Sequence, residues 1–184
     1  MNYFYDMKYS YFILIWLFTV CVSGCSLQKN DKANLKASSE KGQLKAKRYY
    51  SGFPLAHDTY HAISAASDGK IYYVLSSQSE ETGGQMYVYD PATDEPNFIA
   101  DLTEACGEKG LNAISQGKSH VRFYESDGKL YFATHVGYYE MIDGMERLPV
   151  NAPAGYQLYP GGHILSYNLS DGKFEDLALA PAGE

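Results

Sequence analysis

The sequence predicts an all-β fold in which two four-stranded antiparallel sheets follow an N-terminal leader and a basic tether. Residues 61–77 (HAISAASDGKIYYVLSS) align with residues 120–136 (HVRFYESDGKLYFATHV), so one strand–turn–strand unit occurs twice. The segments around each Ser-Asp-Gly-Lys alternate or run apolar and are rich in Tyr, Val, Ile and Phe, which is typical of strands. No stretch of the chain shows convincing helical periodicity. We therefore expect strands and turns to make up nearly all of the folded part.

An apolar leader precedes these repeats. From Tyr11 to Val22 the apolar run covers about a dozen residues, which suits a signal peptide and is too short to span a ~30 Å hydrocarbon core as a helix. The run ends in Val22-Ser23-Gly24-Cys25, which resembles the lipobox of bacterial lipoproteins. This resemblance implies that residues 1–25 are a lipoprotein signal peptide and that Cys25 is acylated as the first mature residue. An uncleaved anchor helix is the alternative.

The residues around the leader bear on its start and its destination. Translation from Met7 gives Met-Lys-Tyr-Ser before the apolar run, a more ordinary signal peptide than translation from Met1 gives. Residue 26 is Ser and not Asp, which by resemblance to Gram-negative lipoproteins favours the outer membrane. We therefore expect a protein of the cell envelope that contacts the membrane through its lipid, in the outer membrane if the cell is Gram-negative.

Charge separates the next segment from the rest of the chain. Residues 26–48 carry a net charge of +5 and lack aromatic residues, whereas residues 49–184 carry −12. The basic segment is interpreted as a disordered tether, which either binds an anionic leaflet or only stays solvated. The acidic part argues against a nucleic-acid partner, because phosphates require a basic face.

Cysteine content limits the chemistry of the folded part. Cys21 lies in the leader and Cys25 is the lipidation candidate, so Cys106 is the one cysteine after the tether. No intramolecular disulfide can form there. Cys106 is expected to be a small buried residue, with a free thiol as the alternative.

In the first copy, Asp68-Gly69 and Asp90-Pro91-Ala92-Thr93-Asp94 predict tight turns between strands. A single helical turn is expected at residues 102–105, before Gly107. The predicted strands cover about residues 61–66, 70–76, 85–90 and 97–102.

In the second copy, Asp127-Gly128 and Asp171-Gly172 predict the corresponding turns. GGHILSYN at residues 161–168 aligns with GGQMYVYD at residues 83–90, which leaves residues 137–162 as an inserted loop. The predicted strands cover about residues 120–125, 129–135, 163–168 and 173–178.

Four-stranded units repeated around such turns resemble the blades of kelch-like and related β-propellers. The resemblance implies a partial β-propeller within residues 49–184, with blade one at about 61–102 and blade two at about 120–178. The chain lacks the kelch signature of paired glycines and Trp, and a generic β-sandwich is the alternative. Propellers close with about four to eight blades, because each blade covers the faces of its neighbours. We therefore expect an N-terminal fragment of a longer propeller, with closure by another chain or a homo-oligomer as the alternative.

Candidate binding residues lie at one rim of the expected blades. Antiparallel strands bring His120, His135 and His163 of the second copy to the same edge, which corresponds to His61, Ser76 and Gln85 of the first. The inserted loop lies over this rim and contains Tyr138 and Tyr139, together with Asp143, Glu146, Tyr156 and Tyr159. The ligand-binding candidates are therefore His61, His120, His135, His163, Tyr138 and Tyr139.

Imidazoles on one rim suit a divalent metal ion, since His is the commonest nitrogen ligand. His120, His135 and His163 are the candidate ligands, although their spacing matches no known metal motif and hydrogen-bonded rim histidines are the alternative. The arrangement loosely resembles that of oligogalacturonate lyases, propellers whose metal is held by His and Gln. His57-Asp58 is a further candidate acid–base pair.

Two functions fit these patterns. The first is a lipid-anchored propeller that binds a carbohydrate or protein ligand at the envelope. The second is an envelope enzyme, a lyase or hydrolase acting on carbohydrate or another small substrate at the propeller entrance. The sequence contains no phosphate-binding glycine loop, nucleophile elbow or HExxH motif.

Overall fold

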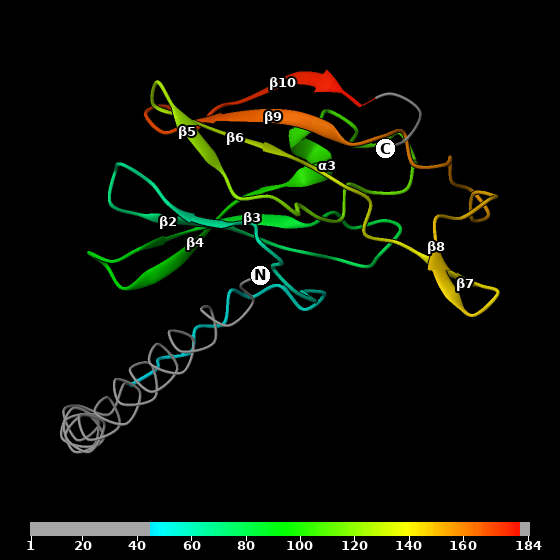
Figure 1. Cartoon of the computed structure of the whole chain (residues 1–184), viewed down its shortest axis with the longest axis horizontal. Coiled ribbons are helices and arrows are strands. Elements are labelled where there is room, and N and C mark those ends of the chain that lie inside the picture. Colours follow the sequence, from blue (N-terminus) through cyan, green and yellow to red (C-terminus); the bar gives the residue numbers. More distant parts are fainter. Residues whose placement is uncertain (1–44, 181–184) are drawn as a thin grey trace, which may run out of the picture. The chain divides into compact units, whose positions relative to one another are not determined.

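The computed structural model describes residues 45–180, and the chain from Arg48 onward forms one compact unit. In this unit the strands of the first copy pair antiparallel in the order β1-β2-β3-β4 (Figure 1). They are β1 (Ile63–Ala65), β2 (Ile71–Leu75), β3 (Gln85–Asp90) and β4 (Glu95–Asp101). The prediction of four antiparallel strands is confirmed for this copy, and its first strand is shorter than expected.

The second copy forms its own four-stranded antiparallel sheet, with the order β10-β9-β6-β5. Its first strand begins at Tyr124 and not at His120, because the backbone just before His120 already pairs elsewhere, through a bridge between Lys118 and His135. The strands are β5 (Tyr124–Ser126), β6 (Lys129–Ala133), β9 (His163–Asn168) and β10 (Phe174–Leu179). The all-β prediction with two four-stranded sheets is therefore confirmed.

The inserted loop contains a small hairpin that was not predicted. β7 (Glu140–Ile142) pairs antiparallel with β8 (Met145–Arg147). Asp143 and Gly144 connect them, both with positive φ (53° and 76°), as a type I′ turn requires. An Asp-Gly pair flanked by Ile142 and Met145 is a hairpin signal, so the sequence contained the information for this element.

The expected helical turn is confirmed as α3 (Leu102–Ala105). Asp101 caps it, because its Oδ1 accepts a hydrogen bond from the Thr103 amide at 2.8 Å. Leu102 is fully buried and fixes the helix to the core. The chain then leaves the helix through Gly107, whose φ is 73°.

The core lies between the two sheets, each of which buries one face against the other (Figure 1). Burying a large apolar side chain contributes about 1.5–3 kcal/mol, so this shared layer is the main source of stability. The buried side chains include Tyr72, Val74, Met86, Leu130, Phe132 and Leu165.

Cys106 belongs to the same core, next to α3. It is buried and free, with its Sγ 3.9 Å from Thr134 Oγ1. Burial raises the pKa of its thiol well above the usual range. The expectation of a small buried residue is confirmed.

The two copies pack head to tail, meaning that one face of the first copy contacts the opposite face of the second. In the aligned repeats Tyr72 of β2 corresponds to Tyr131 of β6. Tyr72 and Val74 are buried in the core between the sheets, but in β6 the core positions are Leu130 and Phe132. Because side chains alternate along a strand, Tyr131 lies on the other side of its sheet. The matching faces of both copies therefore point in the same direction.

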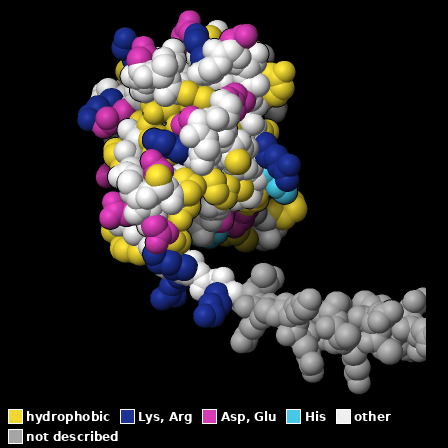
Figure 2. Space-filling model, turned by 90° about the vertical axis from the view of Figure 1, so that its left-hand side faces the viewer, with side chains coloured by type: hydrophobic (Ala, Val, Ile, Leu, Met, Phe, Trp, Pro, Cys, Tyr) yellow, Lys and Arg dark blue, Asp and Glu magenta, His cyan; other side chains and the backbone are white. Residues whose placement is uncertain are grey.

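Both outward faces carry apolar side chains. Ile63 and Phe98 on the first sheet are 50% and 57% exposed, and Tyr124 on the second is 71% exposed. Figure 2 shows hydrophobic side chains at the surface among acidic ones, and basic side chains gathered where the described chain begins.

The leader, Cys25 and most of the tether lie outside the described residues. Between residues 45 and 180, no helix is both long and apolar enough to cross a membrane.

Candidate functional site

The structure separates the predicted site histidines into different environments. His120 and His135 stack on each other, with ring centroids 4.9 Å apart. His163 is buried among carboxylates, whereas His61 is exposed on the surface before β1. The Tyr139 hydroxyl contacts His135, whereas Tyr138 makes no ring contact with either histidine among the described residues. Burial and the neighbouring Glu140 raise the pKa of Tyr138.

His120 and His135 belong to a column of aromatic rings supplied by four loops. Tyr60 stacks on His120 with ring centroids 4.4 Å apart, and Tyr159 lies 6.5 Å from His135 at the other end. The Tyr139 hydroxyl is 3.3 Å from His135 Nδ1. Tyr139 and Tyr159 both come from the inserted loop, so this loop reaches the rim as the sequence predicted.

Close backbone packing holds the loops of this column together. The backbones of Lys118 and His135 exchange two hydrogen bonds, at 2.8 and 2.9 Å. A Cβ at Gly137 would lie 1.9 Å from the Ser77 carbonyl oxygen and 2.8 Å from the Gly117 Cα. Glycine is therefore required at residue 137, because any side chain would push apart the segments that present His120 and His135.

Lys118 lies beside the column and is 3% exposed. Its Nζ lies over two aromatic rings, 5.2 Å from the centroid of Tyr60 and 4.9 Å from that of Tyr139. Among residues 45–180 no carboxylate is within ion-pair distance of this ammonium group, and its Nζ has no hydrogen-bond partner. Buried charges in proteins are normally paired, so this lysine is exceptional.

Buried polar atoms without partners occur in the segments that supply Lys118 and the ring column. Within the described residues they are Asp58 Oδ1, Ser76 Oγ, Ser119 Oγ and His120 Nε2. Ser76 is hydrogen-bonded through its backbone to the Asp58 carbonyl, and Ser119 lies between Lys118 and His120 in the chain. Such atoms are rare in folded proteins and each requires an explanation. We refer to Asp58, Tyr60, Lys118, His120, His135 and Tyr139 as the Lys118 cluster.

The imidazole of His120 has a lowered pKa within this cluster. Burial is the main cause that lowers the pKa of its imidazole below 6.5, and the nearby His135 and Lys118 lower it further. Asp58 opposes this effect. The Asp58 carboxylate is itself bound by His57, with Oδ2 2.5 Å from Nδ1. The predicted His57–Asp58 pair therefore exists and lies next to His120.

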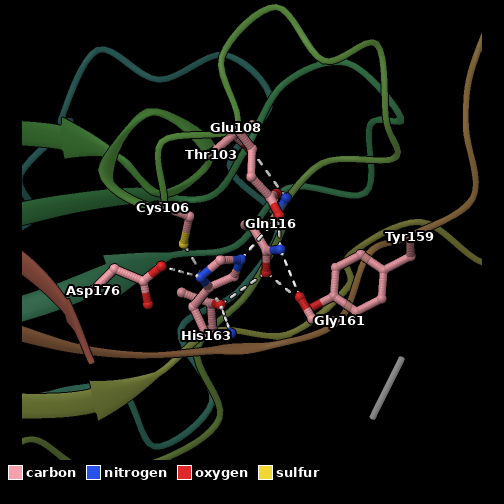
Figure 3. Close-up of polar contacts among 9 residues, drawn as sticks. Thr103, Cys106, Glu108, Gln116, Tyr159, Gly161, His163 and Asp176 are labelled. Carbon is pink, nitrogen blue, oxygen red and sulfur yellow. Dashed lines mark hydrogen bonds and ion pairs between the residues drawn. The ribbon is translucent and has the colours of Figure 1, made fainter. Parts of the chain in front are cut away.

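His163 forms a separate polar network with two carboxylates (Figure 3). Its Nδ1 is 2.8 Å from Asp176 Oδ2, and its Nε2 is 2.9 Å from Glu108 Oε1. His163 and Glu108 are both buried. These contacts join β9, β10 and the segment after α3.

Gln116 completes this network with all of its amide atoms paired. Its Nε2 donates to Glu108 Oε2 at 2.9 Å and to the Gly161 carbonyl at 2.8 Å, and its Oε1 accepts from Thr134 and Tyr159, each at 2.8 Å (Figure 3). We refer to Glu108, Gln116, Thr134, Tyr159, His163 and Asp176 as the His163 network. Tyr159 belongs to both the network and the ring column, so the two regions adjoin.

The three histidines proposed as metal ligands are not brought together as a metal site. Across residues 45–180 no group of three or more His, Cys, Asp or Glu side chains is placed to hold a metal ion. His163 faces Glu108 and Asp176, while His120 and His135 face each other. The alternative of hydrogen-bonded histidines describes His163 better.

Comparisons with protein-family models, with curated proteins and with solved structures found no match to this chain.

Several residues of the site were not singled out from the sequence. Lys118 precedes His120 by two positions, so both lie on one side of an extended segment, and this spacing was the signal for it. The sequence contained no such signal for Tyr60, Gln116 and Glu108. Loops bring these residues to the site, and the length of a loop does not determine which way its backbone runs.

Proposed function

We propose that this chain is a lipid-anchored β-propeller module of the bacterial envelope that binds a ligand at the Lys118 cluster. The observation that carries the binding function is the set of buried polar atoms without partners around Lys118 and His120. A ligand supplies the missing partners and so removes the cost of leaving these atoms unpaired. The ring faces of Tyr60 and Tyr139 suit a carbohydrate or a protein side chain at the same place.

Head-to-tail packing of the copies supports the propeller. A symmetric sandwich brings the same face of each sheet together, whereas a propeller places the front of each blade on the back of the next. Tyr72 in the core and Tyr131 on the outward face fit the second pattern. The apolar outward faces then receive further blades, from a longer chain, another chain or more copies of this one.

The oligomeric state tests how the outward faces are covered. Native mass spectrometry of the purified chain measures whether copies associate through them. An assembly that is lost in Ile164→Glu, which places a charge on the outward face of β9, supports closure by copies of this chain. A stable assembly in that variant contradicts it.

The anchor is proposed from VSGC and from the basic tether, whose lysines favour an anionic leaflet by about 1 kcal/mol each near the surface. Its test is metabolic labelling with a palmitate analogue in bacteria that process lipoproteins. We expect label and membrane association in the natural chain and none of the label in Cys25→Ala. Cys106→Ala is the matched control and should label normally, since Cys106 is in the core. Equal labelling of Cys25→Ala contradicts the anchor.

Ligand binding is tested by thermal shift of the full chain in detergent against neutral sugars, acidic sugars and short peptides. A ligand of this site raises the Tm of the natural chain and does not raise that of His135→Ala. It still raises the Tm of His61→Ala, because His61 is exposed and outside the cluster. A hit that is insensitive to His135→Ala contradicts binding at this site.

One observation also favours the enzyme. A half-buried His with a lowered pKa, an unpaired Nε2 and a neighbouring ammonium group has the properties of a general base. On this alternative, His120→Gln abolishes turnover of an oligosaccharide while its affinity is retained. Equal loss of affinity and turnover favours a binding role for His120.

A further inference from the structure

The charge of Lys118 lacks a partner of opposite sign. The side chain is 3% exposed, and the carboxylates of residues 45–180 are all outside ion-pair distance of its Nζ. Other lysines of the folded unit show what is usual here: Lys70, Lys109 and Lys129 are each paired with an acidic side chain. Compared with Lys70, Lys109 and Lys129, Lys118 is more buried, and it alone of these four lysines has no ion pair.

The groups around Lys118 Nζ compensate its charge only in part. The nearest are the ring faces of Tyr60 and Tyr139, which attract a cation through their quadrupoles and carry no net charge. His120 and His135 carry no negative charge, and burial lowers the pKa of the His120 imidazole. Lys118 Nζ is therefore left without a carboxylate in direct contact.

We propose that the Lys118 cluster binds a carboxylate group of its ligand, with the Lys118 ammonium group as the counter-ion. The proposal rests on the proposed function, because it names the chemical class of what the binding module takes. Charge-assisted hydrogen bonds between an ammonium group and a carboxylate are among the strongest in proteins.

The charge balance favours a carboxylate over a phosphate. The cluster offers one ammonium group, which matches one negative charge. Asp58 lies near enough to act on His120 electrostatically, and its carboxylate repels a second negative charge on the ligand. A phosphate dianion is therefore disfavoured, although it shares the same hydrogen-bonding geometry.

Isothermal titration of the full chain in detergent tests the proposal, with sodium acetate as the probe and sodium chloride at equal ionic strength as the blank. We expect saturable acetate binding in the natural chain. Lys118→Met keeps the apolar stem and removes the charge, so its affinity for acetate should fall about tenfold or more. Lys118→Arg keeps the charge and should retain binding.

Lys109→Met is the matched control, since Lys109 is an exposed and ion-paired lysine of the same unit. It should bind acetate like the natural chain. If Lys118→Met does not unfold cooperatively, Lys118→Gln replaces it in the same titration. Unchanged acetate binding in the folded Met or Gln variant means an adventitious ion only and overturns the proposal, as does the absence of acetate binding in the natural chain.

Further probes separate this proposal from the function on which it rests. Inorganic phosphate that binds as tightly as acetate overturns the assignment of a carboxylate. A neutral sugar that binds and depends on His135, without any binding of acetate, overturns the carboxylate inference and leaves the binding module intact. If neither probe responds to substitutions in the Lys118 cluster, both proposals fall.

Discussion

The Lys118 cluster and the His163 network adjoin each other and are built from similar polar residues, but they differ in how fully they are paired. In the His163 network both ring nitrogens of His163 face carboxylates, and every amide atom of Gln116 has a partner. In the Lys118 cluster the Lys118 ammonium group has no ion pair among residues 45–180, and Asp58 Oδ1 and His120 Nε2 are buried without a hydrogen-bond partner. The first pattern is expected of a part that stabilises the fold, and the second is the part that we propose as a ligand-binding site.

The largest effect on stability is expected from His163→Ala. This substitution leaves the buried carboxylate of Glu108 without its histidine partner, and breaking such a pair costs about 3–5 kcal/mol. Urea unfolding measures the change. His61→Ala is the control, since its exposed side chain should change stability little. A loss below about 1 kcal/mol in His163→Ala would show that the network is not a stabilising unit.

A substitution at Gly137 tests the backbone that supports the Lys118 cluster. The added methyl group of Gly137→Ala meets the Ser77 carbonyl oxygen at 1.9 Å, so the loops must move apart at a cost of about 1–3 kcal/mol. Urea unfolding should show this loss. Gly155→Ala is the comparison, because a Cβ added at Gly155 meets no other atom within 4 Å. The cost there comes from the φ of 87° alone. Equal losses in both variants contradict the close-packing explanation.

Lys118→Met sharpens the contrast between the two regions. Because this ammonium group has no ion pair to lose and its stem is replaced by an apolar side chain, unfolding free energy should change by about 1 kcal/mol or less, or rise. The same urea titration measures it beside His163→Ala. A loss as large as that of His163→Ala would mean that Lys118 is structural, against its proposed role in binding.

The smallest expected effect is a change in the pH dependence of stability. The folded-state pKa of His120 lies below 6.5, chiefly through burial, with His135 and Lys118 adding to the effect and Asp58 opposing it. Protons then bind the unfolded state more tightly, so stability falls as the pH drops through 6.5 towards the folded pKa. His120→Gln should lose less stability than the natural chain between neutral and mildly acidic pH. Parallel unfolding curves for the two proteins would contradict this assignment.

The accuracy of the sequence predictions differed between the sheets and the site. Strand alternation and the Asp-Gly turns located both sheets, because these signals act between neighbouring residues. The first strand of the second copy was expected to begin at about His120 and begins at Tyr124, and the bridge of Lys118 to His135 involves a residue before the aligned repeat. His120 and His135 stack on each other, and His163 pairs through its backbone with Thr134, the residue before His135. The sequence did not indicate that the His163 ring faces Glu108, which comes from the segment after α3.

The sequence by itself determined the all-β class, the duplicated four-stranded unit, the burial of Cys106 and the reach of the inserted loop to the rim. Local periodicity and turn chemistry are sufficient for the fold class and the repeated unit, and the alignment of the two copies locates the inserted loop. Only the tertiary structure decided that Lys118 is buried without a counter-ion while His163 is fully paired. Whether a buried polar group is paired depends on which distant segments contact it, and the packing of the two sheets and their loops determines these contacts.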